Sequence, residues 1–128
     1  MEAVPIIRSG TLVLIGGACT PKGDALGAFV KLAAANEGGP IVGITSASRD
    51  VKGSAAHWEA DFAAAGGGDV VMPIIETRDD ANKRDIAKLV AKARGIFLGG
   101  GDQVKLITTL SGTAVGDAIW DNYVSGGV

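Results

Sequence analysis

Two polar residues behind a run of glycines, directly after an apolar stretch, are the part of this sequence best suited to chemistry. The apolar residues 95–98 lead into the glycines 99–101, and these into Asp102 and Gln103. Glycine lets backbone approach a ligand closely, and backbone N–H groups ahead of a helix attract anions. The pattern predicts a loop for a phosphate or an oxyanion, although it also suits a tight connection in which Asp102 caps the next helix.

Hydroxyl groups follow another apolar run, in the stretch Thr45-Ser46-Ala47-Ser48. Ligands of open parallel sheets bind beyond the carboxyl ends of the strands, so residues 45–49 are a candidate site loop, as are residues 16–22, 76–80 and 99–103. Two interpretations stay open for Ser46 and Ser48: helix capping and turn formation, or contact with a substrate.

Several familiar kinds of site are disfavoured. The glycines after the first apolar run lack the spacing of dinucleotide-binding and Walker motifs, and we expect no cofactor. The single histidine, His57, stands beside Trp58 inside a predicted helix, where we expect a surface or packing role. Cys19 is the only cysteine and is expected to fill space in the fold. No serine, histidine and acid form a recognisable triad.

A group of charged residues between the third strand and the third helix also has a simple interpretation. Glu76, Asp79 and Asp80 stand with Arg78 and Lys83. Acidic residues at the start of a helix complement its dipole, so we expect a solvated helix start. Without histidine or a tighter set of carboxylates, no metal site is predicted.

The elements that must position these residues alternate regularly. Apolar runs bounded by glycine or proline predict buried parallel strands, and stretches with apolar residues three to four apart predict amphipathic helices. The predicted strands are 11–15, 40–45, 69–75 and 95–98; the predicted helices are 24–36, 54–65, 80–93, 103–110 and 113–124. This order predicts an α/β fold with a doubly wound, mainly parallel sheet and helices on both faces.

Composition limits the remaining possibilities. The chain has 128 residues, which suits one domain or part of one. Its formal net charge of -2 gives no reason to expect nucleic acid or a membrane as a partner. The apolar run near the N-terminus is too short for a spanning helix or signal peptide, so we expect a cytoplasmic protein. Residues 125–128 read as the start of a fifth strand, so a partner chain would complete the sheet unless the chain is a fragment.

Taken in order, several segments resemble the N-terminal half of cyanophycinase and the related dipeptidase E-like serine peptidases. They are Gly10-Thr11-Leu12-Val13-Leu14-Ile15-Gly16-Gly17, Ile44-Thr45-Ser46-Ala47-Ser48, residues 95–103 and Gly126-Gly127-Val128. The resemblance covers almost the whole chain. It implies a sheet of the class-I-glutamine-amidotransferase-like or flavodoxin-like kind, incomplete without a C-terminal partner chain. It also implies that residues 1–128 are a single α/β domain, the N-terminal part of a larger hydrolase domain. One departure concerns the early loop, usually Gly-Gly-Gly with acidic residues following, which here reads Gly17-Ala18-Cys19-Thr20 and puts a binding role of that loop in doubt.

The resemblance implies roles for the glycine loop. In the family, a serine on a sharp strand-to-helix turn lies a few residues beyond the equivalent of Gly-Gly-Val. An amide of the glycine loop helps to form the oxyanion hole, which maps onto Gly101, with Gly100 shaping the approach. Gln103 is then expected to contact a β-linked aspartyl substrate, and Asp102 to orient the loop. The family's histidine lies beyond the nucleophile, so His57 does not match it.

The same resemblance implies a partner. We expect the nucleophile on a separate C-terminal chain, produced by self-cleavage after Val128, with the new terminal Thr or Ser as nucleophile. Separate gene products or an experimental fragment are the alternatives. The expected unit is a heteromer that acts on peptides, present as a homodimer of the two-chain unit. The competing functions are a non-catalytic α/β module that binds an anion or nucleotide, and a structural subunit.

Overall fold

A three-stranded parallel sheet forms the centre of the computed structural model, which describes residues 10–15, 23–34 and 38–128. The strands β1 (Gly39–Ile44), β2 (Val70–Val71) and β3 (Ala93–Leu98) lie in the order β2-β1-β3. Ile41 pairs with Val70 on one side of β1, and Ile44 pairs with Leu98 on the other. All the pairing in the described sheet is parallel, as the continuous apolar runs predict.

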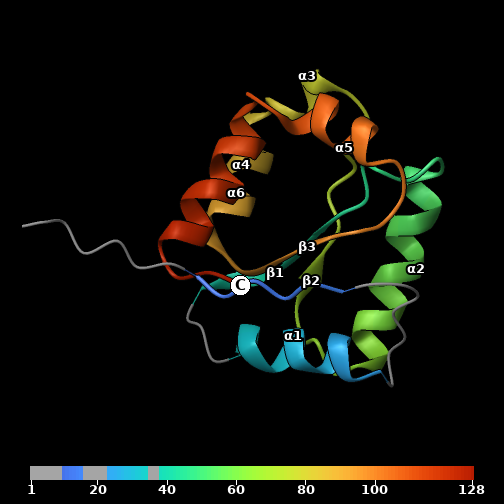
Figure 1. Ribbon diagram of the computed structural model, residues 1–128, viewed down its shortest axis with the longest axis vertical. Coiled ribbons are helices and arrows are strands. Elements are labelled where there is room, and N and C mark those ends of the chain that lie inside the picture. Colours follow the sequence, from blue (N-terminus) through green and yellow to red (C-terminus); the bar gives the residue numbers. More distant parts are fainter. Residues whose placement is uncertain (1–9, 16–22, 35–37) are drawn as a thin grey trace, which may run out of the picture.

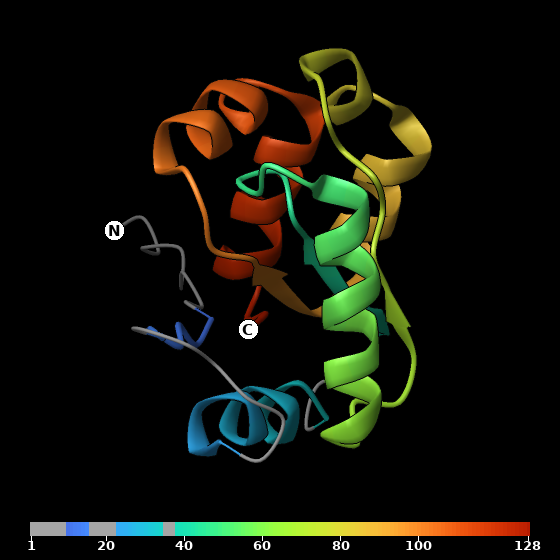
Figure 2. The ribbon, with the colours of Figure 1, turned by 90° about the vertical axis from the view of Figure 1, so that its right-hand side faces the viewer.

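Helices cover both faces of the sheet, which confirms the predicted α/β fold (Figure 1). Their bounds are α1 Asp24–Ala34, α2 Val51–Ala64, α3 Arg78–Ala81, α4 Arg84–Lys92, α5 Gln103–Leu110 and α6 Ala114–Val124. Helices α1 and α2 lie on one side, and α4 and α6 pack together on the other. Figure 2 shows that α3, α5 and the start of α2 lie at the same end of the molecule.

Alternation along β1 divides the core into two hydrophobic clusters. Ile41 faces the α1 and α2 side and joins Phe62 and Phe97, whereas Val42 and Ile44 face the α4 and α6 side. Ile41, Val42 and Ile44 are each fully buried. A strand whose successive side chains enter opposite cores must be apolar throughout, and this explains the unbroken apolar run in the sequence.

Strand β2 is much shorter than the predicted strand 69–75. It pairs with β1 only at Val70 and Val71. Pro73 has no N–H to donate to a ladder, so pairing cannot continue through it. The residues after β2 nevertheless stay in the core, because Ile75 is fully buried.

The predicted helix 80–93 is two helices in the structure. Thr77 caps α3 through a capping box with Asp80, and the helix ends at Asn82. The Asn82 side chain accepts a hydrogen bond from Ala114 N–H at 3.0 Å, at the start of α6. The break between α3 and α4 therefore coincides with a contact to α6, which is distant in the sequence. The three-to-four periodicity of apolar residues does not reveal this contact.

Residues 11–15 form no strand, contrary to the prediction. Leu12 is 68% exposed and Leu14 84% exposed, so this apolar run is not covered on both faces. Thr11 N–H donates to Gly127 O at 3.0 Å, and Gly10 N–H donates to Tyr123 O at 2.6 Å. A ladder needs successive residues to pair, and two bonds near one end of the run do not make one.

The C-terminal residues begin to extend the sheet on the free edge of β3. Ile96 N–H donates to Val128 O at 2.7 Å, which is the kind of contact that an added strand makes. Residues 125–128 form no strand, so the predicted fifth strand is represented only by this one bond to β3. Among the described helices, none is both long and apolar enough to cross a bilayer.

Candidate active site

The glycine loop follows β3 and is docked on the residues that follow β1. Gly99 N–H donates to Ile44 O at 2.9 Å, and Asp102 N–H donates to Ala47 O, also at 2.9 Å. Loops after neighbouring parallel strands share one end of the sheet, so the pairing of β1 with β3 brings these two candidate loops together. The two bonds hold the loop at both of its ends.

Gly101 has to be glycine in this arrangement. Its φ of +145° lies in a region that side-chain-bearing residues rarely adopt, and a Cβ there would collide with Ala47 O. Gly100 differs, because a Cβ at that position would enter open space. The loop therefore combines one tightly constrained glycine with one that leaves the approach to it clear.

The backbone N–H groups of Gly100 and Gly101 have no acceptor among residues 10–15, 23–34 and 38–128. Both residues are exposed, so these donors are available to a ligand. Paired donors held by a fixed loop suit an oxyanion, because they need no reorganisation when negative charge develops.

Asp102 caps helix α5. Its carboxylate accepts hydrogen bonds from Val104 N–H at 2.9 Å and from Lys105 N–H at 3.3 Å. A negative charge at a helix N-terminus is favourable, and capping orients the loop and the helix relative to each other. Gln103, the first residue of α5, is exposed and does not line the cavity described next.

A cavity of about 540 Å³ lies between the glycine loop and the turn after β1. It is lined by Ala47, Ser48, Arg49, Gly100, Gly101, Asp102 and Lys105. Lys105 Nζ donates to Ser48 O at 2.6 Å across a separation of 57 residues. Two cations thus border the cavity, and its single carboxylate is the one that caps α5.

The sequence did not single out Lys105, and it placed Arg49 in a candidate loop without a role. One signal could have found Lys105: a cation in the first turn of a helix faces the positive end of the helix dipole, which is unfavourable without a compensating contact. Here that contact is the carbonyl of Ser48.

The two candidate serines have different surroundings. Ser46 is 1% exposed, and its hydroxyl donates to Ile75 O at 2.7 Å, so it is a buried link to the segment after β2. Ser48 is half-buried and lines the cavity, and its Oγ lies 2.6 Å from Ser54 Oγ in α2. Turn and helix-start contacts therefore occupy both hydroxyls.

The remaining chemistry-bearing residues of the described chain do not line the cavity beside Lys105. His57 instead lines a separate hollow of about 530 Å³, which it shares with Trp58 and Gly100. The His57 side chain is 68% exposed, and its Nε2 lies 3.2 Å from Asp61 Oδ2, one turn along the same helix. Cys19 and the early loop 17–20 fall outside the described residues. No group of three or more His, Cys, Asp or Glu side chains suited to a metal ion occurs in the part of the chain that the structure describes.

The acidic segment before α3 is a capped helix start, as expected. Asp80 accepts hydrogen bonds from Glu76 N–H at 3.0 Å and Thr77 N–H at 3.2 Å, and lies 3.3 Å from Lys83 Nζ. The bond from Glu76 N–H, aided by those from Thr77 and Lys83, lowers the pKa of Asp80 below its ordinary value of 3.8. This carboxylate is therefore engaged in local structure.

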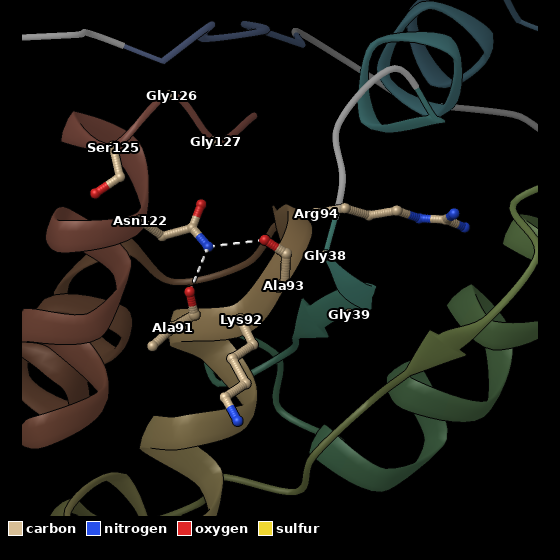
Figure 3. A pocket seen from close by; sticks show the side chains of 10 residues that line it. All are labelled: Gly38, Gly39, Ala91, Lys92, Ala93, Arg94, Asn122, Ser125, Gly126 and Gly127. Carbon is tan, nitrogen blue, oxygen red and sulfur yellow. Dashed lines mark hydrogen bonds between the residues drawn. The ribbon is translucent and has the colours of Figure 1, made fainter.

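A second cavity, of about 490 Å³, lies at the opposite end of the strands, where β1 and β3 begin (Figure 3). Asn122 projects there from α6 and donates to Val90 O, Ala91 O and Ala93 O at 3.1, 3.2 and 2.8 Å. This side chain ties α6 to the end of α4 and the start of β3. The amino ends of parallel strands are not where such sheets bind ligands, so this feature is structural.

A third hollow is mainly apolar and runs along the free edge of β3. Its volume is about 430 Å³, and its lining includes Leu12, Ile96, Leu98, Trp120 and Val128. Trp120 is 63% exposed and Leu98 44% exposed, which is unusual for large apolar side chains that lie together. The edge that Val128 begins to pair with is thus also an uncovered apolar surface.

Comparison with known proteins finds a solved structure with a similar fold. No protein-family model matches the sequence, and neither does any curated protein. The chain is similar to the crystal structure of a peptidase from an acI-B1 Actinobacterium, with a TM-score of 0.68 and 27% sequence identity over 80% of this chain. That match covers 44% of the peptidase, so this chain spans less than half of its length.

The similarity confirms the α/β architecture and identifies the fold as one that a peptidase uses. Membership of the cyanophycinase and dipeptidase E-like group stays a prediction. So do the roles that this resemblance implies for Gly100, Gly101, Asp102 and Gln103.

Proposed function

We propose that this chain forms one wall of a peptidase active site and supplies part of its oxyanion hole. The observation that carries the proposal is the N–H of the exposed residue Gly101, which has no acceptor among the described residues and belongs to a loop held by the Asp102 N–H to Ala47 O bond. The similarity to a solved peptidase supports the choice of reaction.

In this proposal a nucleophile outside the chain attacks the carbonyl carbon of the scissile amide. The carbonyl oxygen becomes an oxyanion, and Gly101 N–H donates to it together with the amide that follows the nucleophile. When the intermediate collapses, the C–N bond breaks and the amine leaves with the proton that the nucleophile gave up. Water then hydrolyses the acyl-enzyme. Removing one such donor typically costs about 100- to 1,000-fold in kcat.

The nucleophile must lie near the glycine loop, and a further strand on the free edge of β3 could place it there. The Ile96 N–H to Val128 O bond shows that the backbone on this edge can pair with a further extended segment. A strand running parallel to β3 would end at the same edge of the sheet as the glycine loop, and would cover the apolar hollow that Leu98 and Trp120 line. We propose that this strand belongs to a C-terminal chain released by self-cleavage after Val128, within a homodimer of two-chain units.

Intact mass measurement of the purified protein tests the processing step. A second polypeptide that begins with Thr or Ser and copurifies with a 12.8 kDa chain supports self-cleavage. A 12.8 kDa species alone, active or inactive, contradicts it.

The proposed substrates are β-aspartyl peptides, of the isoaspartyl or cyanophycin type, with Gln103 contacting the aspartyl group. Gln103 is exposed at the start of α5, and its amide can both donate and accept. The test is hydrolysis of a β-aspartyl dipeptide and its α-linked isomer by the intact protein, with whatever polypeptide copurifies. We expect turnover of the β-linked peptide and a loss of about 10-fold or more in kcat/KM for Gln103→Ala.

Val104→Ala is the matched control, because Val104 is a neighbouring residue of α5 and 69% exposed. It should retain full turnover. Unchanged turnover in Gln103→Ala would remove Gln103 from the site, and absence of turnover by the unaltered protein would refute the proposed function.

A non-catalytic anion-binding module is the second candidate, and the two cations at the cavity favour it. Arg49 and Lys105 would attract an anion whether or not a reaction follows. Binding of a phosphate or nucleotide by the intact protein, combined with no hydrolysis of any β-aspartyl peptide, would support this alternative over the peptidase.

A further inference from the structure

The lining of the cavity beside the glycine loop has two cationic side chains and one carboxylate, which gives it a net positive charge. The ion pairs of the described chain are His57 with Asp61 and Lys83 with Asp80, and neither involves the cavity. Asp102, its only carboxylate, accepts from two backbone N–H groups of α5. Arg49 and Lys105 thus leave a net positive rim around the exposed glycine amides.

Lys105 is held in place by the backbone opposite. Its half-buried side chain crosses from α5 to Ser48, where Nζ donates to the carbonyl oxygen at 2.6 Å. An ammonium group has three donors, so this bond leaves two for a ligand. The contact also fixes the charge at the wall of the cavity instead of letting it extend into solvent.

Arg49 is the more exposed of the two cations. Its side chain is exposed and lines the cavity, and no hydrogen bond or ion pair engages the guanidinium within the described chain. A guanidinium presents a planar fork of donors that matches the two oxygens of a carboxylate. An arginine at the rim beside a fixed lysine is a suitable arrangement for gripping a small anionic group.

We propose that Arg49 and Lys105 form a subsite for the free carboxylate of the substrate, next to the amide bond that is cleaved. In a β-linked aspartyl residue the α-carboxylate stays free, and two carbon atoms, Cα and Cβ, separate it from the scissile carbonyl carbon. An oxyanion at Gly101 would therefore bring that carboxylate to the same cavity, toward the two cations. The role of this subsite in the reaction rests on the proposed peptidase function, whereas its binding of a carboxylate can be tested without that function.

The first experiment compares two substrates in the intact protein with any copurifying polypeptide. One is a β-aspartyl dipeptide with its free α-carboxylate, and the other is the same dipeptide with that group converted to a carboxamide. We expect Arg49→Gln to reduce the preference in kcat/KM for the carboxylate over the carboxamide by about 10- to 100-fold, the range expected of a charged hydrogen bond. Arg84→Gln removes an exposed arginine from α4 and should leave the preference as it is.

Loss of activity on both substrates in the same proportion, or an unchanged preference in Arg49→Gln, would overturn the subsite. Increased salt should weaken the preference of the unaltered protein, because charge interactions at an exposed rim are screened. A preference that does not respond to salt would also count against it.

A second measurement separates failure of the subsite from failure of the peptidase proposal. If the unaltered protein hydrolyses neither dipeptide, N-acetylaspartate is titrated into the ¹⁵N-labelled intact protein. Chemical-shift changes at the Gly100 and Gly101 amides that Arg49→Gln abolishes and Arg84→Gln preserves would support the carboxylate subsite in a protein that is not a peptidase. Absence of such changes would overturn it.

Discussion

Replacing Gly101 by alanine is the sharpest test of how the glycine loop is built. The φ of +145° strains any side-chain-bearing residue, and the new Cβ would collide with Ala47 O. That carbonyl accepts the hydrogen bond from Asp102 N–H at 2.9 Å, so relief of the collision has to lengthen or break this bond. The substitution therefore acts on the backbone conformation and on the docking of the loop together.

The expected loss of stability follows from these two contributions. Strained backbone of this kind costs about 1–3 kcal/mol, and a lost hydrogen bond costs about 0.5–1.5 kcal/mol. Together we expect Gly101→Ala to lower the free energy of unfolding by about 1.5–4.5 kcal/mol. For a chain of this length that corresponds to a fall in Tm of about 10 °C.

Two other glycines separate the contributions. Gly66 has a φ of +79° with open space at its Cβ position, so Gly66→Ala reports the strain alone and should cost about 1 kcal/mol. Gly100 also has open space and no positive φ, so Gly100→Ala should change stability by less than about 0.5 kcal/mol.

Urea denaturation followed by circular dichroism gives all three values, with an unchanged m-value indicating a two-state comparison. A Gly101→Ala variant as stable as Gly100→Ala would refute both the conformation of the loop and its docking on Ala47.

Three further outcomes test contacts elsewhere in the fold. Asn122→Leu keeps the number of side-chain heavy atoms and the branch at Cγ but removes the donors to three backbone carbonyls, and should lower the free energy of unfolding by about 1–3 kcal/mol, measured by urea denaturation; no loss would contradict the buried contact in Figure 3. Arg78→Met removes bonds of 2.8 Å from the guanidinium to two carbonyls at the end of α5, and should cost about 1–2 kcal/mol, measured by thermal unfolding. The pKa of Asp80 is lower in the folded state than its ordinary 3.8, so its contribution to stability is present above about pH 4 and is lost as the pH falls through the folded value. Asp80→Asn should therefore flatten the stability profile below about pH 4, and an identical acid profile in the two proteins would show that Asp80 carries no such linkage.

Much of the architecture could be predicted from local patterns. The apolar runs at β1 and β3, bounded by glycine, identify strands whose successive side chains enter two cores, and both strands occur close to their predicted bounds. Helix α5 starts where the sequence indicates, because Asp102 can cap only the residues immediately after it. These features depend on neighbours within a few residues, so the sequence carries their full signal.

Predictions failed where distant residues decide the outcome. The helix expected over 80–93 breaks because Asn82 reaches Ala114, and the strand expected at 11–15 does not form where Leu12 and Leu14 remain exposed. Periodicity and composition describe which residues prefer to be buried, and they do not say whether a partner covers them.

The chemistry of the glycine loop divides in the same way. By itself the sequence determined that residues 99–103 form a glycine turn ahead of a capped helix, since glycine and a capping aspartate act locally. Only the tertiary structure decided that Gly101 lies against Ala47, that Ser46 is buried against Ile75, and that Lys105 reaches Ser48 across 57 residues. The physical reason is that the segments following two different strands, β1 and β3, line the charged cavity. Whether these segments meet depends on strand order and register, which no single segment encodes.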